Sequence, residues 1–96
     1  MNHMSSIEIL VNKENILEIK IRDEGYTLLN LLVDELNKNT HVKYAAYTVE
    51  HPLEKKIKMI VMTDGEITPL EAIREATKEI KKKIERLREQ IREQMS

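Results

Sequence analysis

The chain of 96 residues has no cysteine, no tryptophan and no phenylalanine, and it has only two glycines and two prolines. Without cysteine, disulfides and thiolate metal sites are excluded. The three histidines, His3, His41 and His51, lie too far apart in sequence for the spacing of zinc ligands. Two glycines cannot build a Gly-rich phosphate loop. We therefore expect no metal site and no cofactor.

Neither sign of charge is in excess: the chain has 16 basic and 17 acidic residues, and its formal net charge is -1. This balance disfavours a general polyanion binder. Aromatic residues make up 3% of the chain, which leaves few rings for stacking on bases. We expect little or no direct nucleic-acid contact.

Long apolar runs are absent as well. No segment approaches the roughly 18 apolar residues that a membrane span needs, and the N-terminus lacks the apolar core of a signal peptide. We therefore expect a soluble, cytoplasmic protein without membrane contact. The serines, Ser5, Ser6 and Ser96, lie only in terminal segments, so a serine nucleophile has no rigid position. We expect no catalytic residues.

The length is that of one domain over residues 1–96. Residues 1–5 are expected to be disordered or a leader derived from cloning. Residues 6–66 are expected to hold a sheet and a first helix, and residues 67–95 a long C-terminal helix. A chain this short buries only roughly 60–65% of its unfolded surface, so additional burial against a partner would stabilise it.

Period-2 alternation and turn residues predict four strands. Ile7 to Val11 and Leu17 to Arg22 flank a polar turn and form an antiparallel hairpin. A third strand over residues 42–49 places Tyr44 and Tyr47 on opposite faces, so only one ring can lie under a helix. His51 and Pro52 end this strand and hold the loop after it. Residues 57–62 are largely apolar, which predicts a central fourth strand.

The first helix is unusually apolar. Gly25 provides the positive φ of a tight turn, Thr27 is the expected N-cap, and the helix runs to about residue 38. Its apolar side chains sweep an arc of roughly 200°, whereas a surface helix shows a stripe of about 100°. A sheet covers only one side, so we favour a partner chain over a purely internal core. Asn30, polar within the arc, is expected to bond to the backbone.

The second helix begins at the clearest local signal in the chain. Thr68 at the N-cap, Pro69 at the first helical position and Glu71 at the third form a capping box. Steps of four and three then give a narrow seam: Ile73, Thr77, Ile80, Ile84, Leu87, Ile91 and Gln94. About 26 residues make a helix of ~39 Å, longer than the ~30 Å span of such a domain. The turns from about Leu87 should overhang the sheet and meet a partner, or else form a charged, fraying tail.

The order strand-strand-helix-strand-strand-helix predicts a two-layer α+β sandwich. Both helices should pack on one face of a four-stranded antiparallel or mixed sheet. The lysine and arginine run after residue 80 is interleaved with glutamates at helical spacing, which indicates a solvated, self-compensating face.

Three segments resemble archaeal DNA-directed RNA polymerase subunit L. They are Gly25-Tyr26-Thr27-Leu28-Leu29-Asn30-Leu31-Leu32, Tyr44 through Leu53, and Thr63-Asp64-Gly65 followed by Thr68-Pro69-Leu70-Glu71-Ala72. The likeness covers about residues 7–84 in the right order and spacing. Tyr26 stands where the family usually has His, and Ala46 stands where Gly is common. These departures concern local turn and packing detail.

The resemblance implies a fold like the dimerisation domain of the bacterial polymerase alpha subunit. It implies a non-catalytic assembly subunit that heterodimerises with the larger assembly subunit of the same polymerase, called D. The two would form the platform for the large catalytic subunits. The helix residues expected to meet the partner are Leu28, Leu29, Leu31, Leu32, Leu36, Ile73, Thr77, Ile80, Ile84 and Leu87. The residues expected to hold turns and packing are Gly25, Thr27, Asn30, Tyr47, His51, Pro52, Thr68, Pro69 and Glu71.

Three other functions are open to such a chain. A homodimeric small regulatory or ligand-binding α+β domain would self-associate and hold a pocket between helices and sheet. A small chromatin or RNA-binding protein would need a basic face, which the charge balance disfavours. A small enzyme would need a nucleophile or metal set, which the sequence does not offer.

Overall fold

The computed structural model describes residues 7–22, 27–51, 53 and 56–96, and its elements follow the predicted order. The predicted leader at 1–5 and the predicted roles of Gly25 and Pro52 lie outside these residues. The elements are β1 (Ile7–Lys13), β2 (Ile16–Arg22), α1 (Thr27–Asn37), β3 (Val42–His51), β4 (Lys56–Thr63) and α2 (Pro69–Met95).

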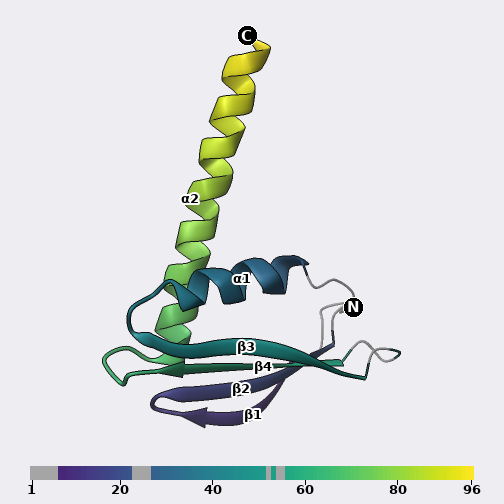
Figure 1. Ribbon diagram of the computed structural model, residues 1–96, viewed down its shortest axis with the longest axis vertical. Helices are drawn as coiled ribbons and strands as arrows, with labels where there is room; N and C mark the ends of the chain where they lie inside the picture. Colours follow the sequence, from purple (N-terminus) through teal and green to yellow (C-terminus); the bar gives the residue numbers. More distant parts are fainter. Residues whose placement is uncertain (1–6, 23–26, 52, 54–55) are drawn as a thin grey trace.

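The four strands form one open sheet in the order β1-β2-β4-β3, and each neighbouring pair is antiparallel. The predicted fold class is confirmed, with antiparallel strands throughout and both helices on one face (Figure 1). The predicted central position of the fourth strand is also confirmed. Along β4, Ile57, Met59, Val61 and Thr63 are buried beneath the helices, and the residues between them face the opposite side.

Helix α1 lies along β3, and Leu29 and Leu36 reach into the core, with exposed fractions of 6% and 0% (Figure 1). Two asparagines fix its position. The Asn37 side chain donates to the carbonyl of Ala45 at 2.9 Å and accepts from the Ala45 N–H at 3.2 Å. This pair satisfies backbone groups on an edge strand, where no neighbouring strand is available to bond them.

Near the other end of α1, the Tyr47 hydroxyl donates to Asn30 Oδ1 at 2.6 Å. The prediction that one tyrosine lies under the helices is therefore confirmed for Tyr47, whereas Tyr44 is exposed on the other face. Asn30 was predicted to bond to the backbone, and this prediction was wrong. Asn30 is exposed, and its side chain accepts from a side-chain hydroxyl. Thr27 is the first residue of α1, as Pro69 is of α2, so it lies one residue past the N-cap position and the prediction for Thr27 was wrong by one residue.

Helix α2 begins with the predicted capping box. The Thr68 hydroxyl accepts from the Glu71 N–H at 3.1 Å, and Glu71 Oε1 accepts from the Thr68 N–H at 2.8 Å. Pro69, Ala72 and Ala76 are the buried residues of the helix, so α2 rests on the sheet only through its first two turns.

Beyond this contact, α2 rises steeply away from the sheet and crosses α1 on the way (Figure 1). Its 27 residues give a length of ~40 Å, and residues 81–96 are all exposed. The overhang was predicted to start at about Leu87, but it starts about two turns earlier. The reason is that the helix does not lie along the sheet. Neither helix of the described chain has the length and apolar character needed to cross a bilayer.

The capping box makes a quantitative prediction. Thr68→Ala should lower the free energy of unfolding by about 1 kcal/mol, because the Glu71 N–H loses its acceptor and Glu71 Oε1 loses the hydrogen bond that the hydroxyl donates. The matched control is Thr77→Ala, since the Thr77 hydroxyl bonds only the Ile73 carbonyl on the exposed helix. Urea denaturation followed by circular dichroism measures both. Equal effects of the two substitutions would contradict the importance of the box.

Candidate functional site

An apolar groove of about 200 Å³ opens where α2 crosses α1. Leu31 of α1 and Ile84 and Leu87 of α2 line it, and their exposed fractions are 49%, 50% and 56%. The remaining lining residues are Asp34, Glu35, Ile80 and Lys83. Large apolar side chains half exposed in one concave patch are typical of a protein-binding surface.

The geometry of α1 explains why part of its apolar arc remains outside. Leu29 and Leu36 point at the sheet, and Leu32 and Val33 pack at the margin of the core. Leu28 and Leu31 fall beyond the flank that the sheet covers, and Leu28 is 67% exposed. The wide arc therefore serves two surfaces, because its inner half fills the core and its outer half faces away from the chain.

The predicted partner-facing residues accordingly separate into groups. Leu31, Ile80, Ile84 and Leu87 come together in the groove. Leu32 and Ile73 are partly buried against the chain's own core. Leu29 and Leu36 are enclosed in that core, so they cannot present their side chains to another chain while this packing is kept, and the prediction is corrected for them. Thr77 is exposed on the helix, and its hydroxyl bonds within its own backbone.

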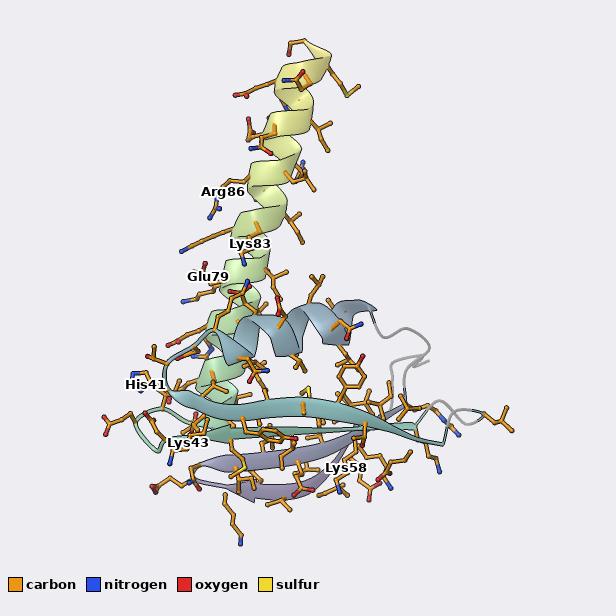
Figure 2. The ribbon with its side chains drawn as sticks, viewed as in Figure 1. His41, Lys43, Lys58, Glu79, Lys83 and Arg86 are labelled. Atoms are coloured by element: carbon orange, nitrogen blue, oxygen red, sulfur yellow. The ribbon has the colours of Figure 1, made fainter. Side chains whose placement is uncertain are left out.

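A salt bridge joins the two helices beside the groove. Lys83 Nζ donates to Glu35 Oε1 at 2.7 Å, and the Glu35 side chain is only 11% exposed. The hydrogen bond from Lys83 lowers the pKa of Glu35 below its ordinary value of 4.5, and the same bond raises the pKa of Lys83 above 10.5. Figure 2 shows Lys83 on α2 just beyond its crossing with α1. The sequence pattern did not indicate this pair, because 48 residues separate its members.

The other side of the helix crossing is polar. A groove there is lined by Glu35, Lys38, Asn39, Glu75, Ala76, Lys78, Glu79 and Lys82. Asn39 Nδ2 donates to Glu75 Oε1 at 2.9 Å across this side. The two sides thus differ in chemistry, and among the described residues only the side with Leu31 has large apolar side chains in its lining.

A histidine–carboxylate pair joins the two turns at the base of the helices. His41 Nδ1 lies 2.9 Å from Asp64 Oδ2, and the Asp64 N–H donates to the His41 carbonyl. The hydrogen bond with Asp64 raises the pKa of His41 above 6.5. Glu66 and Glu75 are the other charged groups that raise the pKa of this histidine. The pair links the turn after α1 to the turn after β4.

The described residues contain no group of three or more histidine, cysteine or carboxylate side chains arranged to hold a metal ion.

The capping-box residues Thr68, Pro69 and Glu71 occupy the start of α2, and His51 is the last residue of β3, paired with Lys56. None of these four residues lines the apolar groove. An apolar groove with a charged rim suits an amphipathic helix from another chain.

Residues 16–90 match the family model described as RNA polymerase Rpb3/Rpb11 dimerisation domain. Over 72 residues, the chain is 50% identical to DNA-directed RNA polymerase subunit Rpo11 of Pyrococcus furiosus, with 73% of this chain and 76% of that protein covered. Its identity to Rpo11 of Saccharolobus solfataricus is 41% over 70 residues, with the same coverage. The crystal structure of DNA-directed RNA polymerase subunit L from Thermoplasma acidophilum matches with a TM-score of 0.79 and 26% identity, covering 95% of this chain and 89% of that one.

The salt bridge beside the groove can be tested by titration. Carboxyl NMR should place the pKa of Glu35 below 4.5, and Lys83→Gln should raise it toward that value because the hydrogen bond is removed. A lowered pKa stabilises the fold above the ordinary value, and this contribution is lost as the pH falls through the lowered value. Lys83→Gln should therefore reduce the loss of stability on acidification. The control Lys81→Gln, on exposed α2, should leave the Glu35 titration unchanged; an equal shift in both variants would contradict the pairing.

Proposed function

Because the chain belongs to the RNA polymerase Rpb3/Rpb11 dimerisation domain family, we propose that it is subunit L of an archaeal RNA polymerase and pairs with the larger assembly subunit of that enzyme. In this role it has no catalytic residues of its own. The pair forms the platform on which the large catalytic subunits assemble in the cytoplasm. The supporting observation is the apolar groove between α1 and α2, which the described residues of the chain leave open.

The proposed contact places an apolar helix face of the larger assembly subunit in this groove. Leu31, Ile84 and Leu87 are each about half exposed, so burying the remainder gains about 1 kcal/mol per residue. Leu28 and Ile80 extend the same surface along α1 and α2. The Glu35–Lys83 bridge links the two helices beside this surface.

A second copy of the chain could occupy the same surface, as a homodimeric regulatory domain would require. Light scattering on the chain alone, and on the chain co-expressed with the larger assembly subunit, distinguishes the two. A 1:1 complex that forms between the two different subunits supports the proposal. A tight homodimer that does not exchange with the larger assembly subunit would contradict it.

Leu31 is the best single position to test this surface, because it lines the groove and is not among the residues packed against the core. A substitution at its neighbour Leu32 would also disturb the core. Leu31→Asp removes the apolar contact and buries an unpaired carboxylate. Binding to the larger assembly subunit should therefore weaken by about 3 kcal/mol or more, about 100-fold in Kd. Titration calorimetry measures the change.

The matched control is Tyr44→Asp, which introduces the same charge at a side chain 52% exposed on the opposite face of the sheet. It should bind the larger assembly subunit as the wild type does. Circular dichroism checks that both variants remain folded. Binding by Leu31→Asp with unchanged affinity would rule out the groove as the contact.

A further inference from the structure

The large apolar side chains at the projecting end of α2 form one stripe. Residues 81–96 are all exposed, and the last turns of the helix stand clear of every other described element (Figure 1). At about 100° per residue, the large apolar side chains of this segment fall within an arc of about 80°. We call them the α2 stripe: Ile84, Leu87, Ile91 and Met95.

The α2 stripe continues the apolar groove between the helices. Ile84 and Leu87 line the groove, and Ile91 and Met95 follow on the same face of α2 with exposed fractions of 49% and 81%. A partner that fills the groove can therefore extend along α2 to its tip. Because an apolar stripe accepts any apolar surface, the choice of partner depends on the charges beside it.

Charged side chains are unevenly distributed around the stripe. Residues 81–96 hold six basic residues and three glutamates. The glutamates lie on the back of the helix, more than about 110° from the centre of the stripe. They are Glu85, Glu89 and Glu93. One border of the stripe is basic and holds Lys81, Arg88 and Arg92. The other border holds Lys83, Gln90 and Gln94. Neither border of this segment carries a carboxylate.

Two arginines lie directly beside the tip of the stripe. A shallow hollow of about 470 Å³ at the end of α2 is lined by Arg88, Ile91, Arg92, Met95 and Ser96. Arg88 donates to Glu85 Oε2 at 3.0 Å, and Arg92 donates to Glu89 Oε2 at 2.9 Å. All four of these charged side chains are more than half exposed, and such surface pairs are weak. A carboxylate presented by a partner at the hollow can therefore replace them.

A second copy of this chain suits the α2 stripe poorly. In a two-fold dimer the same patch of both copies meets. Two copies packed stripe against stripe would bring the basic border against either the same border or the border with Lys83, depending on the direction of the helices. Neither border supplies a carboxylate, so Arg88 and Arg92 would meet like charge or no counter-charge, which disfavours the pair.

Nucleic acid suits this surface poorly as well. Phosphates could pair with Arg88 and Arg92, but they would leave the apolar side chains between the groove and the tip in water. A protein surface that combines apolar side chains with carboxylates satisfies both features of the helix at once.

We propose that the α2 stripe packs on an apolar segment of the larger assembly subunit that is edged with carboxylates, and that Arg88 and Arg92 select this segment over a second copy of the chain. The inference rests on the proposed pairing with that subunit. Arg92 and Met95 lie beyond residues 16–90, the part of the chain that matches the family model. The contact at the tip is therefore inferred from the charges and burial of this chain.

Reversing the charge of the two arginines tests the selection. Arg88→Glu/Arg92→Glu should bind the larger assembly subunit about tenfold more weakly than the wild type, because partner carboxylates then face like charge. The matched control is Lys82→Glu/Arg86→Glu, which makes the same change in net charge on the back of the same helix, and it should bind as the wild type does. Titration calorimetry measures both, and circular dichroism checks that both remain helical. Equal losses in the two double variants would overturn the proposal.

A neutral variant decides the question if the reversed one does not fold. Arg88→Gln/Arg92→Gln removes the attraction without adding repulsion, so its affinity should fall about threefold, and the fall should shrink in about 0.5 M salt. No loss of affinity at low salt would overturn the proposal. A loss of DNA binding by the assembled pair, with unchanged affinity for the larger assembly subunit, would assign the arginines to nucleic acid instead.

Carbodiimide cross-linking locates the carboxylates. It joins a lysine amine to a carboxylate in contact with it, so the variant Arg88→Lys/Arg92→Lys places reactive amines at the basic border. In the complex, mass spectrometry should map cross-links from positions 88 and 92 to carboxylates of the larger assembly subunit. Lys82, on the back of the helix, is the internal control and should not reach that subunit. Cross-links from positions 88 and 92 only to this chain's own glutamates would contradict the proposal.

Self-association tests the second half of the selection. A mixture of wild type and Arg88→Glu/Arg92→Glu should associate more tightly than the wild type alone, because a basic border then meets an acidic one. Sedimentation velocity measures this, and equal association in both samples would contradict selection against a second copy. If wild type does not bind the larger assembly subunit, the proposed function fails. If wild type binds, Leu31→Asp does not, and Arg88→Glu/Arg92→Glu binds unchanged, only this inference fails.

Discussion

The close contact between the first turns of α2 and the sheet determines where the other apolar surfaces lie. Ala72 and Ala76, both buried, let the helix backbone approach β4 closely. Larger residues at these positions would hold the helix off the sheet. Because only two turns rest on the sheet, the remainder of a 27-residue helix has to project. The open groove and the uncovered half of the sheet both result from this steep rise.

Polar side chains fix α1 at the position where its outer leucines stay exposed. Asn37 bonds both backbone groups of Ala45, and Asn30 accepts from Tyr47, so both ends of the helix are tied to β3. Lys83 ties α1 to α2 through Glu35. A helix held only by apolar contacts could rotate to bury Leu28 and Leu31. These directional bonds oppose that rotation and preserve the apolar surface.

The sequence predicted the features that depend on a few neighbouring residues. The features that it missed depend on contacts between residues far apart in the chain. The capping box from Thr68 to Glu71 and the alternation along β2 need only a few neighbouring residues, and both were predicted. The width of the arc on α1 indicated a second apolar surface but not which leucines would form it. Leu29 and Leu31 are two residues apart with similar chemistry, and only the docking of α1 on β3 buries one and exposes the other. Asn37 and the Glu35–Lys83 bridge were missed because their partners are distant in sequence.

The distribution of burial explains why such a chain would keep an incomplete interior. Apolar surface stays exposed on the sheet, on the outer flank of α1 and along the projecting part of α2, and the described residues of the chain do not enclose it. Filling these spaces with larger internal residues would stabilise the lone chain, but it would remove the surface available for association. When folding and pairing share the same apolar surface, the stability of the chain depends on the concentration of its partner. A subunit built in this way is most stable when it is assembled.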